Sequence, residues 1–250
     1  MKDKDLNKTV LRKVLIIVFW LLLWQGASLA VHNSILLAGP YEALSALITL
    51  GKTSGFWLSI LITFLKIASG FFIGLTAGIL LAGLSHKSAF FREFITPPVS
   101  VIKSIPVASF VIMVIIWAGT PSLAVVISAL VVFPMIYHNV LSGLDSVPVS
   151  LTQMSRLFRF RFIDKVRYVS FPSVLPHLQS AVLISSGMAF KSGIAAEVIG
   201  RPLNSVGNGL YLSKISLATA DLFAWTFCAV IMAFIFEKLI YLLLRRICST

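Results

Sequence analysis

The chain has 250 residues, of which 58% are apolar and 12% are charged, and it carries a net charge of +12. Because this apolar share and a mean hydropathy of +0.97 exceed what a soluble domain can cover with polar surface, they exclude a soluble globular protein and predict an integral membrane protein. The two cysteines supply neither a disulfide framework nor metal-ligand spacing, so we expect no metal or other cofactor in this chain.

The first part of the chain contains two long apolar runs. A basic tail over residues 1–13 precedes the first run, 14–31. This order of charged and apolar residues resembles a signal peptide, but the run is long and no small-residue cleavage site stands out, so we interpret it as a retained span. The second run, 56–84, contains Lys66 and several small residues, which allow neighbouring helices to approach closely.

Two further apolar runs, 99–117 and 122–140, are separated by only four residues, 118–121. So short a connection makes them an antiparallel pair. A polar loop, 143–176, follows them, and no serine- or glycine-rich linker divides the chain. We therefore expect an all-α membrane protein with a single domain over 14–250 and six spans, 14–31, 56–84, 99–117, 122–140, 177–199 and 221–244.

The basic residues orient these spans. With the N-terminus in the cytoplasm, every cytoplasmic stretch has a net positive charge, whereas each of the three external stretches sums to zero. This distribution obeys the positive-inside rule. We therefore expect a multi-pass membrane protein with both termini in the cytoplasm, and its basicity does not require nucleic acid as a partner.

The polar loop carries a predicted amphipathic helix. Ser150, followed three residues later by Gln153, has the spacing of a capping box and predicts a helix start. Leu151, Met154 and Phe158 then fall at i, i+3 and i+7, on one face of that helix. Such a helix between two spans is either a docking surface for a cytoplasmic partner or a segment that rests on the lipid surface.

Three charged residues within or beside the spans have competing interpretations. Lys66 lies about ten residues from the external end of its span, from where its ammonium group can reach the interface. Lys191 lies towards the outer side of the fifth span, where it either faces a solute path and attracts an anion or pairs with a carboxylate. Glu197 falls at the external boundary, where a hydrogen-bonded structural role competes with solute contact.

The polar loop resembles a signature of a known family. Bacterial ABC importer permeases carry a cytoplasmic E-A-A-x-x-x-G, followed after nine residues by I-x-L-P. Laid on the loop, this spacing puts Gln153, Met154 and Ser155 at E-A-A and Arg159 at the glycine. Residues 169–172 fall at I-x-L-P, with Pro172 as the identity.

Other stretches are similar to permeases of the nitrate/sulfonate/taurine type. Thr63–Phe71 (TFLKIASGF) resembles their S-L-x-R-V-x-x-G-F, and Lys103–Pro106 resembles R-S-I-P. Phe190–Glu197 (FKSGIAAE) is similar to W-K-x-x-V-A-A-E, and Leu222–Trp225 and the closing Leu-Arg-Arg also fit. The resemblance covers the chain from about residue 36 to 246.

The resemblance implies a type I importer fold and a permease subunit in a bacterial inner membrane. It also implies three partners: a cytoplasmic ABC ATPase, an external solute-binding protein and a second permease subunit, expected to form a homodimer. The sequence contains no G-x-x-x-x-G-K-[ST] phosphate loop, so ATP hydrolysis is expected in the partner. The loop would then hold the coupling helix, with Ser150, Leu151, Gln153, Met154, Ser155, Phe158, Arg159 and Pro172 as its residues.

Arg159 departs from the family signature. A glycine there permits a tight turn, whereas an arginine cannot adopt a positive φ without cost. Either the turn differs in this chain, or Arg159 makes a compensating contact with acidic residues of a dedicated ATPase.

Two other function classes remain as alternatives. An autonomous secondary transporter or channel would work without partners and would usually show inverted repeats, of which the sequence has no convincing example. A membrane-embedded enzyme would need clustered His, Asp or Glu at membrane depth, and no intramembrane carboxylate pair is present. The family resemblance does not name the transported solute, since the binding protein largely sets specificity.

Overall fold

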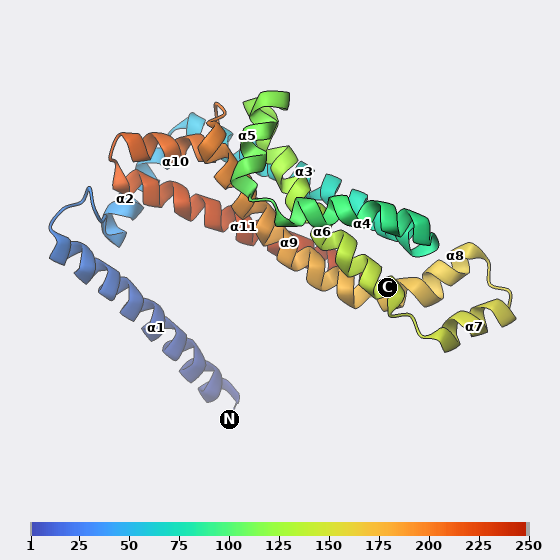
Figure 1. Ribbon diagram of the computed structural model, residues 1–250. Helices are drawn as coiled ribbons and strands as arrows, with labels where there is room; N and C mark the ends of the chain where they lie inside the picture. The colour runs from blue at the N-terminus through green and yellow to red at the C-terminus, as the bar shows by residue number, and fades with distance from the viewer. Residues whose placement is uncertain (1, 249–250) are drawn as a thin grey trace.

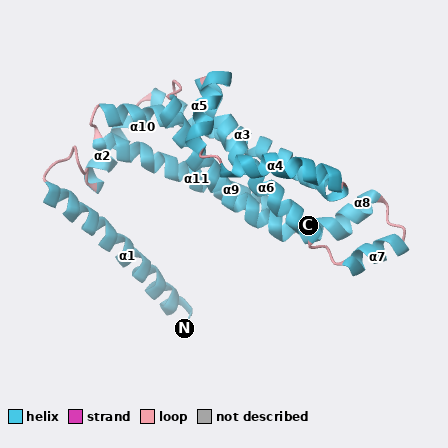
Figure 2. Ribbon diagram, in the orientation of Figure 1, coloured by secondary structure: helices cyan, strands magenta, loops and turns pink. Residues whose placement is uncertain are grey.

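The computed structural model describes residues 2–248, and these residues form helices joined by short turns, with no strand (Figures 1 and 2). The predicted all-α fold class is confirmed. The helices are α1 (Lys2–Val31), α2 (Pro40–Gly51), α3 (Ser54–Lys87), α4 (Ala89–Ser104), α5 (Val107–Ala118), α6 (Leu123–Asp145), α7 (Val149–Leu157), α8 (Phe162–Lys165), α9 (Phe171–Gly200), α10 (Val206–Ile215) and α11 (Thr219–Cys248), with a 3₁₀ turn η1 (Thr120–Ser122) and a π-helical turn η2 (Val166–Ser170).

The core of the bundle is α6, which packs against both α3 and α9. The contact with α3 is close because a Cβ on Gly74 would lie only 2.7 Å from the Ala129 carbonyl oxygen, a separation that only glycine permits. α11 joins this core through Phe236. Its ring centroid lies 5.2 Å from that of Phe71 and 5.1 Å from that of Phe190, within the range of favourable aromatic pairs.

The third predicted span is a bent pair of helices. α4 ends at Ser104 and α5 begins at Val107, and the two axes are bent by 104°. Proline explains the break. Pro106 has no N–H to continue the backbone hydrogen bonds of the helix, and it holds the preceding Ile105 in an extended conformation with ψ of 133°. Among the described residues, five helices are long and apolar enough to cross a membrane, and this pair brings the number to six.

α1 stands apart from the bundle (Figure 1). It is attached near its C-terminal end, where Trp24 Nε1 donates a hydrogen bond to the Ala38 carbonyl at 3.1 Å and its ring lies 5.1 Å from Phe223. The apolar side chains of 14–23 are exposed. This helix therefore contributes little to the core that positions the site.

Candidate functional site

The cytoplasmic loop predicted over 143–176 projects from one end of the bundle (Figure 1). It contains α7 and α8, and η2 then leads directly into α9. Pro172 lies at the start of α9, and the π-helical turn η2 stands directly before it, where the chain has to accommodate a proline that offers no N–H. The loop is therefore a helical hairpin, with α7 as its outgoing arm and α8, η2 and the start of α9 as its returning arm.

The predicted capping box of Ser150 and Gln153 is wrong. α7 begins at Val149, so its N-cap is Pro148, and no side chain caps it. The Pro148 carbonyl accepts hydrogen bonds from the amides of Leu151 and Thr152 at 3.1 and 3.2 Å. Ser150 thus lies inside the first turn. The fixed φ of Pro148, −56°, starts the helix earlier than the spacing of Ser150 and Gln153 suggests.

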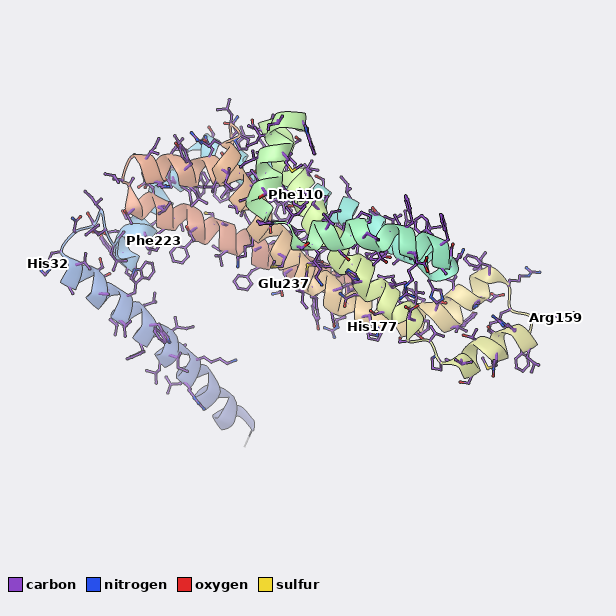
Figure 3. All side chains as sticks on the ribbon, viewed as in Figure 1. His32, Phe110, Arg159, His177, Phe223 and Glu237 are labelled. Atoms are coloured by element: carbon purple, nitrogen blue, oxygen red, sulfur yellow. The ribbon has the colours of Figure 1, made fainter. Side chains whose placement is uncertain are left out.

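α7 ends in a tight left-handed turn even though the family's glycine is absent. Arg159 adopts φ of 51°, and Figure 3 shows it at the outer tip of the loop. The Phe160 amide bonds to the Ser155 carbonyl at 2.9 Å, and the Arg159 amide bonds to the Arg156 carbonyl at 3.1 Å. These two bonds make a Schellman motif. Arginine therefore occupies the same kind of turn that glycine would favour, and no ion pair to it occurs among the side chains that the structure describes, those of residues 11–246.

The predicted apolar face of α7 is exposed to different degrees. Leu151 and Met154 are 37% and 39% exposed, and Phe158 is 67% exposed. Leu157, which was not among the predicted residues, is 81% exposed; it follows Met154 at the i, i+3 spacing and so belongs to the same face. Ser155, at the second alanine of the signature, is the one buried residue of α7, so the helix rests on the loop through its small side and presents its large apolar side chains outward.

Glu197 lies in a buried hydrogen-bonded cluster that joins α3, α9 and α10. Its side chain is fully buried. Thr63 Oγ1 donates to Glu197 Oε2 at 2.9 Å and accepts from the Val206 amide at 3.0 Å, and the Gly207 amide donates to the same carboxylate oxygen at 3.2 Å. A buried carboxylate is stable only with such donors. Through these hydrogen bonds, Glu197 holds the turn between α9 and α10 in place against α3.

The two lysines lie in different surroundings. Lys66 is half-buried and lies one turn along α3 from Thr63, the residue that donates to Glu197. Lys191 is exposed, on a stripe of α9 that also presents Ile184, Met188 and Ile199. Within the described part of the chain, neither lysine forms an ion pair. The structure therefore groups Lys66 with Glu197 and leaves Lys191 on an unpartnered helix face.

No group of three or more metal-ligating side chains occurs among the described residues.

Comparison with known proteins places most of the chain in one family. The profile described as "Binding-protein-dependent transport system inner membrane component" matches residues 74–248. The nitrate import permease protein NrtB of Synechococcus elongatus is 26% identical over 151 residues, which cover 60% of this chain and 54% of that protein. The taurine transport system permease protein TauC of Escherichia coli is 22% identical over 230 residues, covering 90% and 83%. The chain spans about half the length of the first of these relatives.

Solved structures show the same fold. A chain of the bacterial alginate ABC transporter, crystallised with an alginate pentasaccharide-bound periplasmic protein, superposes with a TM-score of 0.66 at 15% identity, covering 100% of this chain and 98% of that chain. A chain of the MetNI methionine ABC transporter has a TM-score of 0.55 at 20% identity, covering 74% and 92%. The helices described above therefore have the arrangement of an ABC importer transmembrane domain.

Proposed function

The chain belongs to the family of binding-protein-dependent transport system inner membrane components, and on that premise we propose that it is the permease subunit of an ATP-driven importer. The proposed partners are a cytoplasmic ABC ATPase, an external solute-binding protein and a second copy of the permease. Neither an ATPase site nor a cofactor is assigned to this chain. The alginate transporter, solved with its periplasmic protein, supports the external partner.

One observation carries the assignment of the docking surface. α7 projects beyond the bundle and presents Leu151, Met154, Leu157 and Phe158 to solvent, although exposed apolar side chains on a helix of a cytoplasmic loop are costly unless a partner covers them. An amphipathic helix that enters a groove is a common recognition mode. We assign these four residues to the ATPase contact.

The test replaces the apolar face with charge. Met154→Asp or Phe158→Asp should lower ATPase affinity by roughly 30-fold or more, because a central contact is worth about 2 kcal/mol and an unpaired carboxylate adds a penalty. Co-purification of the ATPase and its binding constant measure this. Thr152→Asp, which is off the apolar face, is the matched control. Unchanged ATPase binding in both face variants would favour a helix that rests on lipid and would remove the docking assignment.

The proposed topology places the loop in the cytoplasm and the α9–α10 turn outside. In a cysteine-free background, a cysteine at Asn204 should react with a membrane-impermeant thiol reagent in intact cells, whereas one at Ser150 should react only after the cells are opened. Labelling of the Ser150 cysteine in intact cells would contradict both the topology and the cytoplasmic docking surface.

The solute path is proposed to run along the exposed stripe of α9. A lysine among apolar side chains is costly in lipid, so the unpaired Lys191 favours water or solute on that side. Glu197 and Lys66 are assigned a structural role because the Glu197 carboxylate faces Thr63 and Gly207. Lys191→Met should weaken the transport of an anionic solute and leave assembly intact. Loss of assembly instead would indicate that Lys191 pairs with a buried carboxylate of another subunit.

A further inference from the structure

The end of the bundle next to the cytoplasmic loop carries contacts that the proposed docking surface does not use. Asp145, the last residue of α6, uses both carboxylate oxygens. His86 Nδ1, on α3, lies 3.1 Å from Oδ1, and the Arg92 guanidinium, on α4, donates to Oδ2 at 2.8 Å. One carboxylate thus connects three helices, and the connection to α4 is a charge-assisted hydrogen bond.

A second contact attaches the loop to the same place. Lys87 Nζ, at the end of α3, lies 4.2 Å from the centroid of the Phe162 ring, at the start of α8. This is the distance of a cation–π interaction. The turn between α3 and α4, residues 86–92, which we call the elbow, therefore holds both the base of the loop through Asp145 and its returning arm through Phe162.

The base of the loop is closely packed. A Cβ on Gly143 would lie 2.9 Å from Val174 Cα, so the end of α6 and the start of α9 touch without a gap. Tyr137 donates a hydrogen bond to Ser85 Oγ at 3.0 Å, and both side chains are buried. Because packed interiors transmit displacement rather than absorb it, a movement of the loop would carry Asp145 with it.

α4 is suited to respond to such a movement. Val99 is its one buried residue, so little packing holds α4 along its length. Beyond the 104° bend, α5 packs through Val111 and Val114 into a cluster with Leu123 of α6 and Ala196 of α9. A displacement at Arg92 therefore has a route through α4 to the opposite end of α6.

From this geometry we infer that His86, Lys87 and Arg92 are positioning residues of the transport cycle. Their contacts join the docking loop to α4. When the ATPase moves the loop, the bent third span, formed by α4 and α5, therefore moves with it. The inference rests on the proposed function and adds the elbow to it as a second coupling element. Rigid-body movement of packed helices is a known way to transmit such a signal. The Asp145 contacts are partly exposed, with side-chain exposures of 37% to 47%, and exposed ion pairs add little to stability. Their removal should therefore leave the fold intact.

The test uses the complete complex of permease, ATPase and binding protein in liposomes, with the ratio of solute transported to ATP hydrolysed as the readout. Arg92→Asp places two carboxylates together and should lower that ratio roughly tenfold, within the usual range of coupling energies. The ATPase should remain bound and the melting temperature should stay unchanged. The exchanged pair Arg92→Asp with Asp145→Arg should recover most of the ratio. Glu93→Gln, a charge change on the neighbouring exposed residue of α4, is the matched control.

Substitutions of Lys87 provide a second, independent test of the inference. Lys87→Met removes the charge over Phe162 and should lower the same ratio, whereas Lys87→Arg retains a cation on the ring and should preserve it. An unchanged ratio in both Arg92→Asp and Lys87→Met would overturn the inference, as would loss of ATPase binding in Arg92→Asp, because the elbow would then be part of the docking surface. Absence of ATP-driven transport in the unaltered complex would overturn the proposed function as well, so the two failures are distinguishable.

Discussion

Two turns at opposite ends of the bundle place an arginine in the left-handed region, with φ of 51° at Arg159 in the loop over 143–176 and 50° at Arg201 after α9. Each lies two residues from a highly exposed leucine, Leu157 at 81% and Leu203 at 83%. The two turns differ in what holds them. The α9–α10 turn is fixed by the buried Glu197 cluster, whereas the α7 turn is closed by its own backbone hydrogen bonds.

The difference shows that local backbone geometry does not decide how firmly a segment is placed. Buried side-chain hydrogen bonds join the α9–α10 turn to α3, so its position is set within the single chain. α7 buries only Ser155, and its position relative to the bundle depends on the base of the loop. A segment with few buried contacts and an exposed apolar face is what a docking element requires, because low local stability permits movement.

The largest expected effect is at the anchor of the α9–α10 turn. Glu197→Ala would leave the Thr63 hydroxyl and the Gly207 amide buried without an acceptor, at a cost of about 3 kcal/mol in the free energy of unfolding. Denaturant unfolding in detergent measures it. Ser155→Ala at the other turn removes only a bond to the Thr152 carbonyl and should cost less than about 1 kcal/mol. Equal losses at the two positions would contradict the difference in anchoring.

A smaller loss in the free energy of unfolding is expected for a substitution where α10 packs closely against α9. Gly207→Ala would bring a Cβ to 2.6 Å from the Val198 amide nitrogen, and the overpacking should cost about 2 kcal/mol. Gly187→Ala, in α9, is the matched control because nothing lies within 4 Å of its Cβ position. That change should be neutral or slightly stabilising. A neutral result for Gly207→Ala would mean that α10 can shift away from α9.

Amide hydrogen exchange should separate the two segments directly. The amides of α7 should exchange roughly tenfold or more faster than those of α10, because opening α7 exposes only one buried side chain, that of Ser155. Adding the ATPase should slow exchange in α7 and leave α10 unchanged. Equal protection of both helices in the free permease would show that the loop is as firmly placed as the α9–α10 turn.

The smallest effects concern the two arginines. Arg159→Gly relieves a left-handed residue but adds backbone freedom to the unfolded chain, so the net change should be within about 0.5 kcal/mol. Arg201→Gly also loses the guanidinium stacked 4.2 Å from the Tyr211 ring and should cost about 0.5–1 kcal/mol more. Thermal unfolding of both variants measures the difference. If Arg159→Gly reduced ATPase-coupled transport without changing stability, Arg159 would contact the ATPase.

Several features of this protein could be predicted from the sequence because they depend on local pattern. The long apolar runs predicted the membrane helices, since a backbone in lipid must satisfy its own hydrogen bonds. The i, i+3, i+7 spacing of Leu151, Met154 and Phe158 predicted a helix that the structure contains. The loop signature and the other matching stretches predicted the family, which the profile over residues 74–248 confirms.

Some local predictions failed because a neighbouring residue outweighed the pattern. Ser150 and Gln153 have capping-box spacing, but Pro148 starts the helix before them. The third span predicted over 99–117 did not include the bend that Pro106 imposes after Ser104. In both cases the fixed φ and missing N–H of proline decided the backbone.

The anchors of the site were decided by tertiary structure alone. Glu197 bonds to Thr63, 134 positions away, and Asp145 bonds to Arg92 and His86, 53 and 59 positions away. No periodicity links such residues, because helices arrange their side chains locally while packing selects which faces meet. Sequence determined the helices, their polar interruptions and the family. The packing of α3, α6 and α9 determined that Glu197 is an anchor and that the elbow holds the loop.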